Sequence, residues 1–366
     1  MSIKLHTLYI LVILQVFQFN SLKAQEKPVR LAVVGMTHGH VGWILGREKK
    51  GDIELVGLWE PNEDLAKRLI DRHKLESDLW YGDFDRMLKE VKPEAVCAFG
   101  SIYDHLMVVE KCAPLGIHVM VEKPLAVNME HAKNMKALAD THGIHLLTNY
   151  ETSWYASNHK IHELTRKGII GEIRKIVVHD GHSGPIEIGC SKEFLAWLTD
   201  PILNGGGAII DFGCYGANLS TWLMDNQRPV SVTAVTQQLK PHMYPEVDDE
   251  ATIIVEYPKS QTIIQASWNW PFSRKDIEVY GQKGQLIAPN GRTLKSKLIG
   301  SAEETLILPP LQNLQNDPFA FFAGVINGEI NPSKGLYSLE NNMIVVEILS
   351  SAILSAKEGK TVYFSK

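Results

Sequence analysis

Short apolar runs alternate with amphipathic segments along the first 150 residues of the chain. Apolar runs of strand length occur at 29–34, 55–59, 95–99, 119–121 and 145–148. Apolar residues recur at helical spacing between them, at 41–48, 63–73, 104–115 and 128–142. Continuously apolar strands separated by helices are typical of a parallel sheet covered on both faces. The pattern therefore predicts an α/β domain over residues 28–149.

The hydrophobic period changes to two in the second half of the chain. Alternating or β-branched runs of strand length occur at 231–239, 251–257, 262–268, 276–280 and 285–288. Turn sequences such as Pro258-Lys259-Ser260-Gln261 separate them, and helical patterns occur at 217–224 and 338–357. This combination predicts an α+β domain over residues 150–366, with a large open antiparallel sheet.

The amino terminus differs from the rest of the chain. Lys4 and His6 precede an apolar run from Leu8 to Phe19, which small and polar residues follow up to Ala24. This is typical of a secretory signal peptide over residues 1–24, and an uncleaved membrane anchor is the alternative. We therefore expect an exported, periplasmic protein without a stable membrane span after cleavage.

The overall composition is that of a soluble globular protein. Of the 366 residues, 45% are hydrophobic and 22% are charged, and the formal net charge is -5. Basic residues are scattered, which argues against a nucleic-acid partner. The four cysteines have no zinc-site spacing, so no metal is expected, while Cys190 and Cys214 could pair or stay free.

The turn after the first predicted strand is rich in glycine and histidine. It reads Gly35-Met36-Thr37-His38-Gly39-His40, with Thr37 and His40 where a dinucleotide-binding turn carries its second and third glycines. A pyrophosphate could instead approach the backbone a few residues later, at Gly39 or Gly42, and His38 or His40 could bind a phosphate. A glycine-rich turn without a ligand is the alternative.

Glu60 ends the second predicted strand, 25 residues after Gly35. This offset is close to that of the acidic residue that binds a ribose diol in dinucleotide-binding domains. A carboxylate there accepts hydroxyl hydrogen bonds and repels a 2′-phosphate, so we expect NAD rather than NADP as the cofactor.

Candidate catalytic groups come from both halves of the chain. Lys123 follows a buried strand within Glu122-Lys123-Pro124, where proline restricts the backbone and a half-buried lysine suits proton transfer. Asp211 and Tyr215 lie four residues apart after the glycines at 205–207, and so share one helix face. Lys123, Asp211 and Tyr215 would form a proton-relay set for oxidising an alcohol. The alternative is a helix-capping aspartate with a tyrosine at the rim.

Taken together, these segments resemble the Gfo/Idh/MocA family of oxidoreductases, which includes glucose–fructose oxidoreductase and inositol dehydrogenase. The matching pieces are 122–124, 168–173, 205–215, 247–251, 280–284, 339–342 and 359–362. The resemblance implies a Rossmann-type first domain and a homodimer or homotetramer formed through the second sheet.

The resemblance also implies residue roles. Lys123 would contact the nicotinamide ribose and the substrate hydroxyl, and Asp211 would orient the substrate. Tyr215 stands where histidine is usual, as in the glucose–fructose oxidoreductase branch, and would need Lys123 to lower its pKa. The cofactor would be bound by the turn at 35–40 and by Glu60, Gly100, Ser101, His105, Glu122 and Lys123. The segment 99–105 keeps the family's histidine but lacks its usual Pro-Asn pair.

The substrate expected from these groups is a carbohydrate. Tyr150, Trp154 and His182 would line its site together with Asp211 and Tyr215, because sugar sites combine aromatic faces with hydrogen-bonding groups. The sequence thus predicts an exported NAD-dependent oxidoreductase acting on a carbohydrate hydroxyl, with tightly bound, recycled NAD. The alternatives are a glycoside-cleaving enzyme that works by oxidation and elimination, and a non-catalytic sugar-binding protein.

Overall fold

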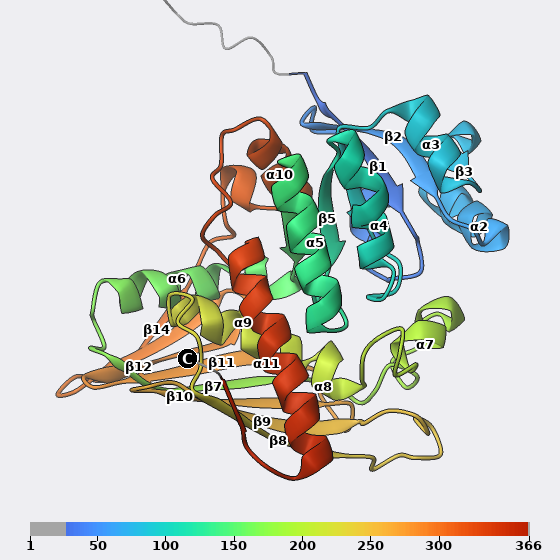
Figure 1. Ribbon diagram of the computed structural model, residues 1–366. Coiled ribbons are helices and arrows are strands. Elements are labelled where there is room, and N and C mark those ends of the chain that lie inside the picture. The colour runs from blue at the N-terminus through green and yellow to red at the C-terminus, as the bar shows by residue number, and fades with distance from the viewer. Residues whose placement is uncertain (1–26, 365–366) are drawn as a thin grey trace, which may run out of the picture.

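The computed structural model describes residues 27–364, so the predicted signal peptide lies outside the described residues. Two sheets dominate the fold, one in each half of the chain (Figure 1). The site described below lies where the carboxyl ends of the first sheet's strands meet the second half.

The first sheet is parallel and has the strand order β3-β2-β1-β4-β5-β6. Its strands are β1 (Val29–Val34), β2 (Ile53–Trp59), β3 (Trp80–Tyr81), β4 (Ala95–Ala98), β5 (His118–Glu122) and β6 (Leu146–Asn149). The connecting helices are α1 (Val41–Leu45), α2 (Glu63–His73), α3 (Phe84–Val91), α4 (His105–Cys112) and α5 (Met129–His142). This confirms the predicted α/β fold. The strand order reverses between β1 and β4, and ligands of such sheets bind in the crevice at that point.

Helices cover both faces of the first sheet. The core on one face combines side chains of α3, α4 and α5 with alternate residues of the strands. On the other face, Phe319 and Phe322 of α10 (Pro318–Ile326) pack with Leu31 and Val33 of β1. Helix α10, near the carboxyl end of the chain, thus completes the core of the first sheet. The predicted domain boundary at residue 150 did not indicate this contact.

The second sheet has nine strands in the order β14-β13-β12-β11-β7-β10-β9-β8-β15. The strands are β7 (Ile173–Gly181), β8 (Ser231–Gln237), β9 (Glu250–Glu256), β10 (Gln261–Ser267), β11 (Arg274–Gly281), β12 (Gly284–Asn290), β13 (Thr293–Leu298), β14 (Glu304–Ile307) and β15 (Val362–Tyr363). β7 and β10 pair in parallel, whereas the other neighbouring strands pair antiparallel. The predicted open sheet is confirmed, and this one parallel pair makes it mixed.

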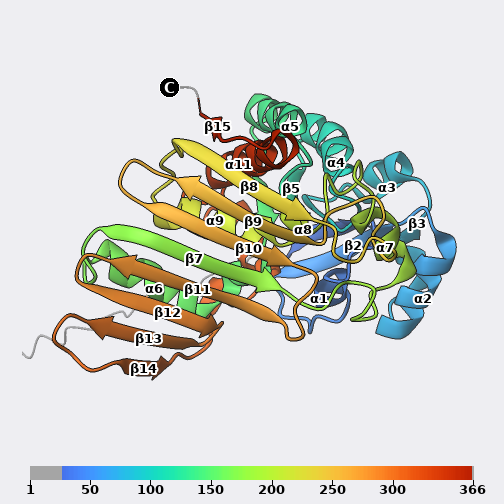
Figure 2. The ribbon, with the colours of Figure 1, turned by 90° about the horizontal axis from the view of Figure 1, so that it is seen from below.

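Helices cover one face of the second sheet. They are α6 (Ala156–Arg166), α8 (Ala208–Asp211), α9 (Gly213–Leu223) and α11 (Leu339–Glu358), whereas α7 (Lys192–Leu198) lies beyond the sheet, near the first domain. Viewed from below, the described residues place no helix over the other face (Figure 2). By length and composition α11 could span a membrane, but Val345, Ile348 and Leu349 are buried in the core beside β8 and α9.

Candidate active site

A cavity of about 770 Å³ lies between the β1–α1 turn, the end of β5 and the second sheet. We call it the main cavity. It contains charged and histidine side chains from both domains. The groups relevant to its chemistry are His38, His40, Lys123, Glu151, His182, Asp211, Tyr215 and Lys275. The structure therefore brings the three predicted catalytic residues together.

Lys123 and Asp211 form a buried ion pair at the junction of the domains. Lys123 Nζ lies 2.5 Å from Asp211 Oδ1 and 3.0 Å from the Asp211 carbonyl oxygen. The indole Nε1 of Trp268 donates to the other carboxylate oxygen at 2.9 Å. Burial opposes both charges, but their attraction raises the pKa of Lys123 and lowers that of Asp211. Lys123 is therefore a fixed ammonium donor and does not accept a proton at neutral pH.

Tyr215 lies on α9, and two ammonium groups lie over its ring. Lys123 Nζ is 5.1 Å and Lys275 Nζ is 4.7 Å from the ring centroid. Asp211 and Glu151, respectively, neutralise these lysines. Burial raises the pKa of the Tyr215 hydroxyl well above its usual value, and Glu151 adds to this rise. The expectation that Lys123 lowers this pKa is therefore wrong, because its ammonium faces the ring and is paired with a carboxylate.

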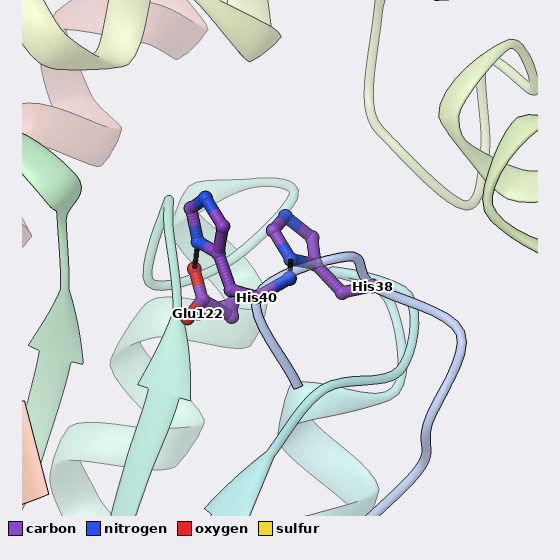
Figure 3. Close-up of side chains that lie close together, drawn as sticks. All are labelled: His38, His40 and Glu122. Atoms are coloured by element: carbon purple, nitrogen blue, oxygen red, sulfur yellow. Dashed lines mark hydrogen bonds and ion pairs between the residues drawn. The ribbon is translucent and has the colours of Figure 1, made fainter. Parts of the chain in front are cut away.

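Two histidines of the β1–α1 turn lie beside Glu122, at the end of β5 (Figure 3). His40 Nδ1 lies 3.0 Å from Glu122 Oε2, and Asn149 Nδ2 donates to Oε1 at 2.7 Å. Although burial opposes ionisation, His40, His38 and these hydrogen bonds lower the pKa of Glu122 to about 2. Because Glu122 is ionised, Nδ1 of His40 is the donor in this contact, which leaves Nε2 as the ring nitrogen that Glu122 does not use.

His38 is more deeply buried than His40. Its ring contacts those of Phe194 and Trp197, and burial lowers its pKa well below the usual value. His38 Nδ1 accepts the His40 backbone N–H at 3.1 Å, so Nε2 carries the ring proton. Ligating atoms of His38, His40 and Glu122 lie within 4.8 Å of one another. Hydrogen bonds use Nδ1 of both histidines and one oxygen of Glu122, so the three side chains form one hydrogen-bonded network.

A separate groove of about 220 Å³ lies at the strand-order reversal of the first sheet. We call it the crevice. A Cβ on Gly35 would lie 2.7 Å from the Gly100 backbone nitrogen, and the φ of Gly35 is +72°. The two chain segments thus approach so closely that only glycine fits, which leaves backbone surface open to a ligand.

Three polar side chains of the crevice fit a nucleotide. Glu60 accepts the N–H groups of Met36 at 2.7 Å and Asn62 at 2.9 Å, and its carboxylate oxygens keep further acceptor capacity. His105 Nδ1 donates to the Leu125 carbonyl oxygen at 3.1 Å, and its Nε2 has no partner among the described residues. Burial lowers the pKa of His105 to about 4, so this nitrogen is a neutral acceptor suited to a ribose hydroxyl. Ser101 also lines the crevice. These residues fit a dinucleotide.

Helix α7, together with the residues around it, passes over the turn at 35–40. Trp197 Nε1 donates to Thr37 Oγ1 at 3.0 Å, and Arg68 of α2 pairs with Glu193 at 2.7 Å. The same segment lines both the main cavity, through Phe194, and the crevice, through Trp197. We call α7 (Lys192–Leu198) the strap, because it lies between the main cavity and the crevice. Thr37, which stands where a glycine was expected, is thus a hydrogen-bond partner of the strap.

Some predicted substrate residues do not line the main cavity. Tyr150 is fully buried and packs edge-on against Tyr215, at 5.6 Å between centroids. Trp154 donates to Asn149 and lies outside the main cavity, on a neighbouring pocket. His182 does line the cavity, and its Nδ1 accepts the Gly184 N–H at 2.9 Å. All four cysteines are free.

Lys275, at the start of β11, was not among the site residues predicted from the sequence. It enters the site because β11 pairs with β7, a register that local sequence does not reveal. Lys275 forms an ion pair with Glu151, and Tyr155 donates to the same carboxylate at 2.5 Å. Basic and acidic residues at strand ends are common, so the sequence offered no signal for this group.

Family models match most of the chain. A model described as "Oxidoreductase family, NAD-binding Rossmann fold" matches residues 29–150, and the GFO/IDH/MocA C-terminal domain model matches residues 158–287. Among curated proteins, D-xylose 1-dehydrogenase [NADP(+)] of Haloarcula marismortui is 26% identical, over 72% of each chain. A trans-1,2-dihydrobenzene-1,2-diol dehydrogenase of Xenopus tropicalis is 24% identical, over 69% of this chain and 72% of its own.

Solved structures share the fold. An inositol dehydrogenase homolog of Azotobacter vinelandii, complexed with NAD+, gives a TM-score of 0.79 at 19% identity and covers 93% of this chain and 98% of its own. The aldose–aldose oxidoreductase of Caulobacter crescentus, complexed with glycerol, gives 0.76 at 21% identity and covers 92% and 100%. At these identities the likeness shows the fold alone.

Proposed function

The chain belongs to the Gfo/Idh/MocA family of oxidoreductases, and on that premise we propose that it oxidises a carbohydrate CH–OH group with bound NAD. The observation that carries the proposal is the buried Lys123–Asp211 pair, which joins the end of β5 to the second domain in the wall of the main cavity. The relatives named for xylose and for a cyclic diol support a hydroxyl-bearing ring as substrate.

Residues of this chain would hold the cofactor along one path. Gly35 and Gly100 provide the close approach in the crevice, Glu60 and His105 would accept ribose hydroxyls, and the turn at 37–40 leads towards Lys123. When bound there, a nicotinamide supplies the hydride acceptor.

We assign the proton transfer to His40. Oxidation of CH–OH releases one hydride and one proton, so a base must take the proton. Lys123 is held as an ammonium and Tyr215 stays a phenol, so both donate hydrogen bonds to the substrate oxygen. His40 lines the cavity, and Glu122 orients its ring and stabilises the imidazolium formed on protonation.

The cofactor is proposed to stay bound between turnovers. The Trp197–Thr37 and Arg68–Glu193 contacts hold α7 across the path between the crevice and the main cavity. A dinucleotide on this path would be covered by the strap, and it would leave only when these contacts open. Recycling would then come from a second substrate or from a later step of the same cycle.

Cofactor choice is expected to depend on Glu60. The Glu60→Gln variant removes the charge that disfavours a 2′-phosphate, so the NAD:NADP ratio bound by the protein should fall by about tenfold or more. The ratio is measured by mass spectrometry of denatured extracts. Glu54→Gln is the control, because Glu54 lies on the same strand but pairs with Arg30 on the surface. An unchanged ratio in Glu60→Gln would refute the role of Glu60.

The proposed function is tested on the purified protein. We expect its denatured extract to contain nicotinamide and a sugar to reduce the bound cofactor with formation of a keto-sugar. A protein that contains no nicotinamide and binds none when it is added is not an oxidoreductase of this kind. Release of a free aglycone without net oxidation would instead support the glycoside-cleaving alternative.

Export and assembly complete the proposal. The apolar run at 8–19 supports secretion to the periplasm, which N-terminal sequencing of the mature protein tests. The uncovered face of the second sheet supports a homodimer or homotetramer, which light scattering tests.

A further inference from the structure

A second pocket of about 320 Å³ adjoins the main cavity, and we call it the side pocket. Its lining includes Trp43, Arg47, Trp154, Asn316 and Phe319. Glu151 and Tyr155 line both hollows, and the Tyr155 hydroxyl donates to Glu151 at 2.5 Å. These two side chains therefore form a shared wall between the two hollows.

A second contact between the main cavity and the side pocket is a stack of two aromatic rings. His40, in the main cavity, stacks on Trp43, in the side pocket, with 3.8 Å between centroids and 17° between planes. The indole is nevertheless 37% exposed. An apolar ring surface thus lies open directly beside the proposed proton acceptor.

Arg47, one of the residues that line the side pocket, has an unused hydrogen-bond donor. The Arg47 side chain is 92% buried, and its terminal nitrogens bind Asp52 and Asp317. Its Nε is buried without a partner among the residues described. A buried donor without an acceptor is costly, which points to a ligand acceptor or a water at this position.

The charges of the side pocket balance locally. Arg47 and Lys50 face Asp52 and Asp317, and Glu151 is paired with Lys275. The site therefore favours a neutral ligand. Its aromatic surface and its unpaired N–H suit a pyranose ring, which presents apolar C–H faces and oxygen acceptors.

We propose that the side pocket binds the second sugar unit of a di- or oligosaccharide whose first ring reacts in the main cavity. This inference rests on the proposed function. It names the substrate class as a di- or oligosaccharide and not a single sugar unit.

The test compares matched sugars on the holoprotein. The pairs are cellobiose with methyl β-glucoside, lactose with methyl β-galactoside, and xylobiose with methyl β-xyloside. We expect at least one disaccharide to exceed its partner in kcat/KM by roughly tenfold, the order that a buried aromatic contact contributes. Trp43→Ala and Asn316→Ala should each reduce this ratio towards one. The ratio is the readout because Trp43 also packs on His40. Tyr363→Ala, an exposed residue of β15, should leave the ratio unchanged.

Two results overturn the inference. One is a ratio near one for every pair in the wild type, and the other is a ratio that neither substitution changes. If no sugar reduces the cofactor, the proposed function fails separately. Isothermal titration of the same pairs then decides the side pocket: equal affinities of the disaccharide and the monosaccharide refute it, and a disaccharide preference that Trp43→Ala removes supports it.

Discussion

Lys123→Met is expected to lower turnover by about 10²–10³-fold, the loss typical when one positioned donor to a developing oxyanion is removed. Lys123 provides the only ammonium that pairs with Asp211 in the described part of the cavity wall. Without it the substrate oxygen loses its charged partner. Turnover is measured as reduction of the bound cofactor in a single cycle, and the cofactor content of the variant is measured alongside.

The same variant should also be less stable. Removing Lys123 leaves the Asp211 carboxylate buried, with Trp268 as its remaining side-chain donor. Breaking a buried ion pair costs about 3–5 kcal/mol, so a fall in melting temperature of several degrees is expected.

A double variant separates the two effects. Lys123→Met with Asp211→Asn removes the unpaired charge and should recover most of the melting temperature without recovering turnover. A double variant that recovered both would show that Lys123 acts only by holding the fold together.

His40→Asn is expected to slow the chemical step by about 10²–10⁴-fold, the usual contribution of a positioned acid or base. The asparagine amide can still donate to Glu122, as His40 Nδ1 does, but nothing replaces Nε2. The fold and the Glu122 network should therefore stay intact, and the loss should lie in kcat more than in KM.

Tyr215→Phe is the matched comparison, because it removes one hydroxyl from the same cavity. We expect the smaller loss here, since the raised pKa of Tyr215 keeps it a hydrogen-bond donor. If His40→Asn keeps the wild-type rate while Tyr215→Phe abolishes it, the tyrosine is the proton acceptor and our assignment is wrong.

The architecture was largely predictable from the chain. Continuous apolar strands between helical segments indicated the parallel sheet, and period-two segments indicated the open sheet. The predictions failed where distant segments meet. The parallel pairing of β7 with β10 and the packing of α10 on the first sheet depend on contacts between residues far apart in sequence.

The site was also predictable only in part, because local patterns indicate single residues but not the contacts between distant ones. Lys123, Asp211 and Tyr215 could be named from local patterns, because a strand end and a helix face position each of them. The protonation states of these side chains could not be predicted from the sequence, because they depend on ion pairs, such as that of Lys275 with Glu151, that only the tertiary fold creates. Tyr150 was misplaced because the sequence around an aromatic residue after a strand is the same whether the residue lines a cavity or fills a core, and Trp154 lines the side pocket instead of the main cavity.

The proposed hydride transfer runs from a sugar in the main cavity to a nicotinamide beside Lys123. It is tested most directly with carbon-deuterated sugars, by mass spectrometry of the cofactor extracted after one turnover. We predict that the reduced nicotinamide carries deuterium in the wild type and that Lys123→Met shows little or none in the same time. If a sugar is bound and altered while the extracted cofactor stays free of deuterium, hydride transfer to the nicotinamide does not take place.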